Sequence, residues 1–324
     1  MIVYPVAVIG GGSGGVMALL RTILNNQKCL FFPGSPKDKK KSRALWVTKV
    51  ENIPGHFHYK KGISDPNRET IEWILNSPFE KNFFFKKNRG VISLQKREDG
   101  LFLIEDDQNE HYLCQFVVLA TGVMDIQPHI GGSISSVLPY ANNSQMDYCL
   151  RCDGHHTLGK NASVIGHNNS AAWVAIMLYE RYQNPSMAIF THGERPSFDE
   201  EVWELIKLYN IKIYEQEIIE LKGNGKELEG MILKDGTLVK SQISFVCLGM
   251  IIHNHLAKEL GAALDERGFV LTNNKGETSV PNLFVAGDLR AHTKKQIYSA
   301  WDQAVDSADT IDSRIRKSNR AKLV

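Results

Sequence analysis

The chain of 324 residues has few cysteines, no long apolar run and almost no excess of charge of either sign. Five cysteines are too few for a disulfide scaffold in a chain of this length, so we expect a cytoplasmic protein whose paired cysteines serve redox or metal chemistry. The net charge of +2 argues against the strongly basic surface of proteins that bind nucleic acid or a membrane.

The longest uncharged stretch, residues 1–20, is interrupted by five glycines, whereas a membrane helix needs roughly 20 mostly apolar residues. The N-terminus also lacks the basic region of a signal peptide, so no cleaved leader is expected. Hydrophobic residues make up 43% and charged residues 23% of the chain. This ordinary globular composition excludes disordered and fibrous classes, and the length allows two or three domains.

Two stretches, 6–20 and 162–178, share one pattern: a β-branched run, a turn of small residues and an apolar segment long enough for a helix. This pattern opens the βαβ unit that binds nucleotides. Apolar runs at 116–122, 243–249 and 283–287 end in glycine, as buried parallel strands do. Runs at 101–105 and 228–233 are expected to be antiparallel inserts. The sequence therefore predicts an α/β fold with two doubly wound nucleotide-binding lobes.

The first turn has the spacing Gly-x-Gly-x-x-Gly at the end of an apolar strand. Gly10 permits the tight turn, Gly12 lets a pyrophosphate approach the backbone, and Gly15 lets the helix pack closely on the strand. The phosphates would lie at the helix start, where N–H groups are unpaired. The next strand, 29–34, ends without the Asp or Glu that usually holds the adenosine ribose.

A second signal is Cys149-Leu150-Arg151-Cys152-Asp153-Gly154. Two cysteines at this spacing close a small redox disulfide, and a helix start or Arg151 would lower the pKa of one thiol. Asp153 is a candidate proton donor and acceptor, because reduction of a disulfide requires protonation of the leaving thiolate.

Two other interpretations of the cysteine pair remain open: a zinc site that adds His155 and His156, and an inert surface pair. Structural zinc usually takes its ligands from two separated pairs, whereas these four residues lie within eight positions. We therefore expect redox work and no metal.

The order of these motifs resembles the low-molecular-weight thioredoxin reductases over essentially the whole chain. It comprises the first glycine turn, the Val-Glu-Asn-Ile-Pro-Gly stretch at 50–55, Ala-Thr-Gly at 120–122, the Cys-x-x-Cys-Asp-Gly element, the second nucleotide turn and a late Gly-Asp pair at 287–288. The resemblance implies a discontinuous FAD-binding domain at 1–126 and 252–324. An inserted NAD(P)-like domain at 127–251 would carry the cysteines.

The resemblance also implies site residues. The first turn would hold the FAD pyrophosphate, the asparagine at 52 would contact the flavin, the aspartate at 288 would bind the ribityl chain, and the glutamine at the start of the last helix would lie by the isoalloxazine. The residues implied for FAD are Gly10, Gly12, Ser13, Gly14, Gly15, Asn52, Ala120, Thr121, Gly122, Gly287, Asp288, Gln296 and Ile297.

In such an enzyme Cys152 would face the flavin and receive electrons, Cys149 would attack the partner disulfide, and Asp153 would be the acid and base. The acceptor would be thioredoxin or a similar small redox protein, and the protein would be a homodimer. Two alternatives remain. A flavoenzyme that acts on a small-molecule disulfide or dithiol would use the same cysteines, whereas a flavin- or zinc-binding interaction protein would have no catalytic activity.

The chain departs from the family at the NADPH site. Asn168 replaces the second glycine of the second turn, and the segment after the next strand offers Glu194 beside Arg195 where the family has a basic cluster. Use of NADPH or NADH is therefore in doubt, and a ferredoxin-like electron donor is the alternative. The lysine-rich segment 37–43 would dock such a donor or simply form a solvated loop.

Overall fold

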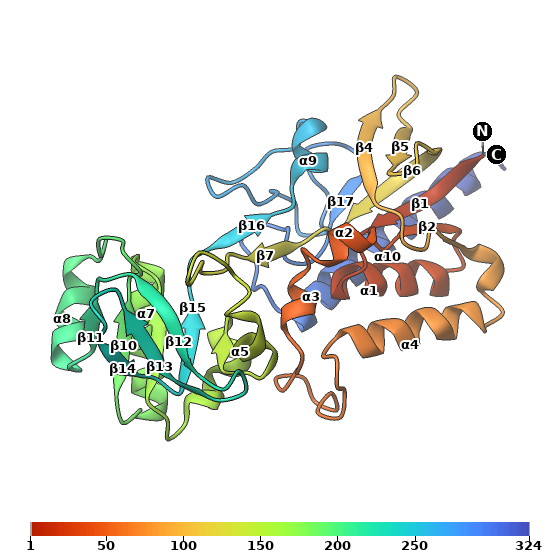
Figure 1. Cartoon of the computed structure of the whole chain (residues 1–324). Coiled ribbons are helices and arrows are strands. Elements are labelled where there is room, and N and C mark those ends of the chain that lie inside the picture. Colours follow the sequence, from red (N-terminus) through yellow and green to blue (C-terminus); the bar gives the residue numbers. More distant parts are fainter. Residues whose placement is uncertain (1, 324) are drawn as a thin grey trace. The chain divides into compact units, whose positions relative to one another are not determined.

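The structure is a computed structural model that describes residues 2–323, with the side chains of residues 45 and 46 left out. The chain forms two compact units (Figure 1). The first comprises the chain up to Leu45, Ile63–Met124, and the chain from Ile252 onward; the second comprises Trp46–Gly62 and Asp125–Ile251. The segment Trp46–Gly62, which the sequence assigns to the first domain, thus groups with the second unit. The Thr48 hydroxyl there donates to the Asn142 carbonyl at 3.3 Å.

The first unit is built on a seven-stranded sheet in the order β3-β2-β1-β6-β5-β4, with β17 also paired to β6. β1, β2, β3 and β17 run parallel to their neighbours, whereas β4, β5 and the first half of β6 pair antiparallel. The predicted parallel strands and the antiparallel insert are therefore confirmed. The strands are β1 (Val3–Ile9), β2 (Cys29–Phe32), β3 (Phe83–Phe85), β4 (Val91–Lys96), β5 (Phe102–Asp106), β6 (His111–Leu119) and β17 (Leu283–Val285).

Apolar side chains from three long helices cover one face of this sheet. Val16 and Leu19 of α1 (Ser13–Leu24), Ile74 of α4 (Ser64–Leu75) and Ile311 of α10 (Ile297–Ala321) pack there against β1, β2, β6 and β17. The short helix α9 (His255–Glu259) contributes to the core on the opposite face through Leu256. Burial on both faces explains why the parallel strands read as continuous apolar runs.

The lysine-rich segment expected to be a loop contains one helical turn, α2 (Pro36–Lys39). Ser35 caps it, since its hydroxyl accepts from the Asp38 N–H at 3.2 Å and the Asp38 carboxylate accepts from the Ser35 N–H at 3.0 Å. This reciprocal capping box, with Pro36 at the first helical position, stabilises a helix start. Two further short elements of this unit are α3 (Arg43–Trp46) and the 3₁₀ helix η1 (Glu80–Asn82).

The second unit holds a five-stranded sheet in the order β11-β10-β9-β15-β8 and a three-stranded antiparallel sheet, β12-β13-β14. The two chain crossings between the units, β7 (Val123–Asp125) and β16 (Met250–Ile252), pair with each other. The strands are β8 (Met146–Asp147), β9 (Ala162–Ile165), β10 (Met187–Phe190), β11 (Lys212–Tyr214), β12 (Ile218–Gly223), β13 (Leu228–Leu233), β14 (Leu238–Lys240) and β15 (Ile243–Val246). The helices are α5 (Leu138–Asn142), α6 (Leu150–Asp153), η2 (Gly154–Thr157), α7 (Asn169–Tyr182) and α8 (Glu200–Leu208).

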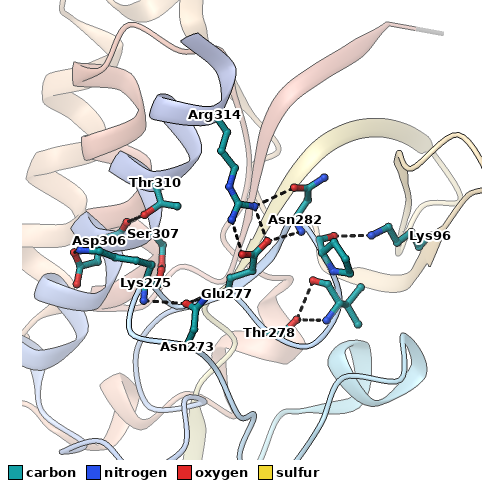
Figure 2. A network of polar contacts seen from close by, with 12 residues as sticks. Lys96, Asn273, Lys275, Glu277, Thr278, Asn282, Asp306, Ser307, Thr310 and Arg314 are labelled. Atoms are coloured by element: carbon teal, nitrogen blue, oxygen red, sulfur yellow. Dashed lines mark hydrogen bonds and ion pairs between the residues drawn. The ribbon is translucent and has the colours of Figure 1, made fainter. Parts of the chain in front are cut away.

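A polar network fastens α10 to the loop that precedes β17 (Figure 2). Arg314 donates to both carboxylate oxygens of Glu277 at 2.5 and 2.6 Å, and the Asn282 N–H donates to the same carboxylate at 3.0 Å. Glu277 is the more buried partner, with 13% of its side chain exposed against 40% for Arg314. Because β17 carries the Gly-Asp turn, this network positions part of the predicted FAD site.

We predict that Glu277→Gln destabilises the protein by about 1–3 kcal/mol at neutral pH, because it removes charge-assisted hydrogen bonds. The bonds from Arg314 lower the pKa of Glu277. A carboxyl group with a lowered folded-state pKa stabilises the fold above its unfolded pKa, and this contribution disappears as the pH falls through the folded value. The difference in urea midpoint between wild type and variant should therefore shrink below about pH 4.3, the ordinary value for Glu.

Lys275→Met is the matched control, because Lys275 belongs to the same network but 60% of its side chain is exposed where it meets Asp306. An exposed ion pair contributes about 1 kcal/mol or less. Equal losses in the two variants would contradict the special role given to Glu277.

Candidate functional site

The first glycine turn joins β1 to α1 through two close approaches. Gly10 has φ of +119°, and a Cβ there would lie 2.2 Å from the Ala120 carbonyl oxygen. A Cβ on Gly15 would lie 1.8 Å from the Gly10 carbonyl oxygen. Both positions therefore require glycine for α1 to rest on the sheet, as the spacing predicts. A Cβ on Gly12, in contrast, would meet nothing within 4 Å.

Gly12 is also the N-cap of α1, and no side chain caps this helix. The N–H groups of the first turn, which include those of Ser13 and Gly14, have no partner within a helix by construction. A backbone that is open on its outer side and has uncapped N–H groups is the arrangement that accepts a phosphate. The structure thus provides space and donors at the place where the sequence predicts a pyrophosphate.

The late Gly-Asp turn lies against this first turn. A Cβ on Gly14 would be 3.3 Å from the Gly287 nitrogen, so the two backbones nearly touch. The Gly287 N–H, in a residue with φ of +82°, donates to the side-chain oxygen of buried Gln303 at 2.9 Å. Gln303 lies on α10 and has no sequence motif, so sequence reasoning missed it. Its position seven residues after Gln296, two helical turns further on, is the only signal.

Other predicted residues gather at the same edge of the sheet. Ala120, Thr121 and Gly122 directly follow β6, and the Thr121 hydroxyl donates to the His253 carbonyl at 2.6 Å. Asp288 pairs with Arg43 at 3.3 Å. The structure therefore brings together the residues from the first turn, from the end of β6 and from the end of β17.

The start of α10 is buried and basic. Gln296 is the N-cap of this helix and is buried, and Ile297 is its first residue. The neighbouring Lys295 stacks over the Phe269 ring with its Nζ 4.0 Å from the ring centroid, and it donates to the Arg290 carbonyl. Burial lowers the pKa of Lys295 to about 8, although Asp288 and Asp265 oppose the shift.

A carboxylate does lie at the end of β2, although the strand itself supplies none. A capping box with Ser35 holds Asp38, and one of its carboxylate oxygens would lie 3.8 Å from a Cβ on Gly34 and 2.3 Å from a Cβ on Gly90. Sequence reasoning looked for an acid at the strand end itself. Asp38 is four residues beyond Gly34, and the helical turn α2 brings its carboxylate back to the strand end. The Ser-x-x-Asp spacing of a capping box is the sequence signal that indicates this turn.

In the second unit Cys149 and Cys152 form a disulfide, with 5.3 Å between their Cα atoms. Both residues are half-buried, and Asp153 beside them is buried. Cys149 is the N-cap of α6, and its sulfur accepts from the Cys152 N–H at 3.2 Å. A hydrogen bond of this kind favours a thiolate on Cys149 once the disulfide is reduced.

The two histidines that follow turn to Glu51. Nε2 of His155 and Nε2 of His156 lie 2.8 and 2.7 Å from the same Glu51 oxygen, and Nδ1 of His156 lies 2.8 Å from Asp147. The hydrogen bond to Asp147 is the main reason that the pKa of His156 rises to about 9, and the bond from His156 is the main cause that lowers the pKa of Glu51.

The zinc arrangement of two cysteines and two histidines is not what the described residues form. The two sulfurs are bonded to each other, and the ligand group that the described residues offer consists of Glu51, His155 and His156. Asn52 follows Glu51 and so belongs to the second unit, with the cysteines, whereas the glycine turn belongs to the first.

The second nucleotide turn differs from the first at its helix start. A Cβ on Gly166 would lie 2.5 Å from the Ala171 Cβ, so this glycine is needed for packing. Asn168 caps α7 with its own side chain, whose oxygen accepts from the Ala171 N–H at 3.1 Å. The Asp199 N–H donates to Asn169 at 2.9 Å, which fastens the loop before α8 to the same helix start.

The three remaining cysteines are unbonded. Burial raises the pKa of Cys29 and Cys114 far above its usual range and that of Cys247 to about 12. These thiols are protonated at neutral pH and are poor nucleophiles, as their apolar sequence surroundings indicate.

Two units that each place a helix start behind a β-strand, together with a Cys-x-x-Cys disulfide followed by a buried aspartate, define a disulfide oxidoreductase fold with two nucleotide-binding domains. Residues 4–308 match the pyridine nucleotide-disulphide oxidoreductase family, and the chain belongs to this family.

The relatives include a thioredoxin reductase of Mycoplasma pneumoniae, 28% identical over 96% of this chain and 95% of its own length. A ferredoxin–NADP reductase of Mesorhizobium japonicum is 26% identical over 90% of this chain and 84% of its own. The solved thioredoxin reductase of Streptococcus pyogenes superposes with a TM-score of 0.81 at 19% identity, covering 97% of this chain and 99% of its own. The predicted fold class and the resemblance to thioredoxin reductases are confirmed. Among the described residues, every helix is too short or too polar to cross a membrane.

We predict that Gly15→Ala and Gly12→Ala act differently. The Cβ at position 15 meets a backbone oxygen at 1.8 Å, and forcing α1 off the sheet should destabilise the protein by about 3 kcal/mol or more. The Cβ at position 12 has free space, so Gly12→Ala should change stability by about 1 kcal/mol or less yet weaken retention of a phosphate-bearing cofactor. Thermal unfolding and the cofactor content of the purified proteins check this. Equal destabilisation by both changes would contradict the geometry.

Proposed function

We propose that this chain is an FAD-dependent dithiol–disulfide oxidoreductase that passes electrons from reduced flavin through Cys149 and Cys152 to thioredoxin or a similar small redox protein. The observation that carries the proposal is the half-buried disulfide at the start of α6 with the buried carboxyl group of Asp153 beside it. Family membership supplies the flavin and pyridine nucleotide chemistry as a class.

The first unit fits FAD. The open side of Gly12 and the uncapped start of α1 suit the pyrophosphate, and Asp288, next to the Gly287 turn, suits a ribityl hydroxyl. Asp38 is in place to accept from an adenosine ribose hydroxyl, the role for which the strand end offers no acid. When bound, FAD supplies a two-electron carrier. Burial lowers the pKa of Lys295 to about 8, so most of its ammonium groups stay charged at neutral pH beside Gln296.

The cysteines and the aspartate carry out the exchange. The Cys149–Cys152 disulfide accepts two electrons, and Asp153 protonates one of the two sulfurs that are released. The Cys149 thiolate attacks one sulfur of the partner disulfide, which gives a mixed disulfide and releases the partner's other sulfur as a thiolate. Asp153 then takes the proton back from Cys152, and the resulting thiolate attacks the Cys149 sulfur and re-forms the internal disulfide. Asp153 returns this proton to the second partner sulfur as it leaves, and the first partner thiolate takes its proton from water. Two electrons and two protons are transferred to the partner.

The hydrogen bond to Cys149 supports this division of roles. The Cys152 N–H points at the Cys149 sulfur and would stabilise negative charge there, which suits the sulfur that attacks and leaves. Cys152 is then the sulfur that exchanges electrons with the flavin, as in the family that the motifs resemble.

We predict that Cys149→Ser and Cys152→Ser each abolish disulfide turnover and differ in colour. The Cys149→Ser protein should show the long-wavelength absorbance of a thiolate next to oxidised flavin, because Cys152 can no longer form its disulfide, and the Cys152→Ser protein should lack it. The control is Cys247→Ser, which removes an unbonded thiol with a raised pKa and should keep full turnover. Turnover retained by Cys152→Ser would reject the proposal. Comparing thioredoxin with a small disulfide as substrate separates the protein acceptor from the small-molecule alternative.

The electron donor is proposed to be a ferredoxin-like protein rather than NADPH. The N–H group that a pyrophosphate would use at the start of α7 already binds the Asn168 side chain, and Glu194 is exposed where a 2′-phosphate would lie. The exposed lysines Lys37, Lys40 and Lys41 offer a basic surface to an acidic donor.

Stopped-flow mixing of the FAD-loaded protein with NADPH, NADH and reduced ferredoxin tests the donor. We predict slow or absent flavin bleaching with both nucleotides and fast bleaching with ferredoxin. Asn168→Gly removes the competing cap and should raise the rate of bleaching by pyridine nucleotide about 10-fold or more. Bleaching of the wild-type flavin within milliseconds at micromolar NADPH would show that the Asn168 cap is no obstacle, and the donor proposal would fail while the dithiol proposal stands.

A further inference from the structure

We propose that Glu51, His155 and His156 bind a divalent transition-metal ion of the zinc class, with Asp147 orienting His156. This site goes beyond the proposed function, because it uses none of Cys149, Cys152 and Asp153 and binds an ion without electron transfer. All four residues belong to the second unit.

The three ligand atoms already converge on one point. One oxygen of Glu51 lies 2.8 and 2.7 Å from the Nε2 atoms of the two imidazoles, and all three atoms lie within 4.8 Å of one another. Donor atoms of a tetrahedral zinc site, with bonds of about 2.0–2.1 Å, lie roughly 3.3 Å apart. The donor atoms must therefore move apart by about 0.5 Å from their hydrogen-bonded distances to admit an ion. Small rotations of the His155 and Glu51 side chains, which are 49% and 32% exposed, supply this movement while His156 stays in place.

Asp147 gives His156 the environment of a metal ligand. Its carboxylate lies 2.8 Å from Nδ1 of His156, and only 9% of the Asp147 side chain is exposed. In the neutral ring, a carboxylate on one ring nitrogen fixes the tautomer, so that the lone pair is on the other nitrogen, and makes that nitrogen a better ligand. An ion that binds Nε2 therefore replaces its proton. Nε2, the nitrogen left for the ion, is the atom that points at Glu51.

The backbone that carries the two histidines is well fixed. They lie in η2, whose last residue, Thr157, is fully buried and donates through its hydroxyl to the Gly154 carbonyl at 2.8 Å. Buried Asn184 donates to the Thr157 carbonyl at 2.7 Å. A rigid pair of adjacent histidines needs little reordering to bind an ion, which favours affinity.

The ligand chemistry selects the ion and leaves it reachable. Two imidazoles and one carboxylate suit zinc and its neighbours in the first transition row, whereas magnesium and calcium prefer oxygen alone. The side chains of His155 and Glu51 are 49% and 32% exposed, so an ion can enter and water can complete its shell. Three protein ligands with one open position is the arrangement of catalytic rather than structural zinc.

Zinc titration of the full-length, disulfide-oxidised protein tests the proposal, with a competing chelator to report free zinc. We expect one equivalent to bind. Glu51→Gln and His155→Ala should each weaken binding at least 10-fold, and Asp147→Asn should weaken it about 10–100-fold. His111→Ala is the matched control. His111 is 45% exposed and faces Glu105, 31% exposed, at 3.9 Å, and it belongs to no group of three metal-ligating side chains among the described residues. The variant should bind zinc as the wild type does.

Cobalt replaces zinc in a second measurement. Difference spectra of the cobalt-loaded, oxidised protein against the metal-free protein should show d–d bands without sulfur-to-metal charge transfer, and His155→Ala should lack them. Thermal unfolding verifies that each variant is folded. If His155→Ala does not fold, the test rests on Glu51→Gln, which preserves the shape of the side chain. Absence of a bound equivalent, equal binding by Glu51→Gln and wild type, or sulfur charge transfer would overturn the proposal, leaving only a hydrogen-bonded cluster.

Discussion

The contact on which the first unit depends is the approach of α1 to the strand that precedes it. The space where a side chain on Gly15 would begin is filled by the Gly10 carbonyl oxygen, and Gly10 itself is pressed against Ala120. This contact fixes the position of the first turn of α1 relative to the sheet, and so the position of the N–H groups in that turn. Gly287 reaches the same place from β17 because Gln303 holds its N–H. The predicted cofactor site, which combines distant segments of the chain, thus depends on glycine at positions 10 and 15.

The parts of the fold that the sequence predicts well are those with local causes. The runs before Gly10 and Gly166 become β1 and β9, and the apolar segments after the turns become α1 and α7. Each of these elements follows from the spacing of apolar residues and from small residues that only a tight turn requires. The Cys-x-x-Cys pair is equally local, since its spacing alone allows a disulfide. The helical turn α2 also has a local cause, the capping box of Ser35 and Asp38, although the charge composition of residues 37–43 predicts a loop.

The parts that the sequence could not predict depend on residues far apart in the chain. Glu51 meets His155 across 104 positions, and no periodicity links a carboxylate in one segment to imidazoles in another. The hydrogen bond from Gly287 to Gln303 is equally hard to predict, because Gln303 lies on α10 and packing decides which side of that helix faces Gly287. The grouping of residues 46–62 with the second unit has this origin too, because it follows from contacts such as that of Glu51 rather than from its place in the chain.

The two helix starts differ in what satisfies their first N–H groups, although both follow a β-strand in the same way. Every helix begins with N–H groups that need acceptors. At α1 the capping position is a glycine, so the acceptor has to come from water or from a bound anion. At α7 Asn168 supplies the acceptor itself, which stabilises the helix by about 1 kcal/mol relative to an uncapped start. That one N–H group is open to an anion only when the side chain moves away. The second unit therefore keeps the glycine that packing requires, Gly166, and has Asn168 at the capping position where the first unit has Gly12. The packing role and the capping role of such a turn can thus vary separately.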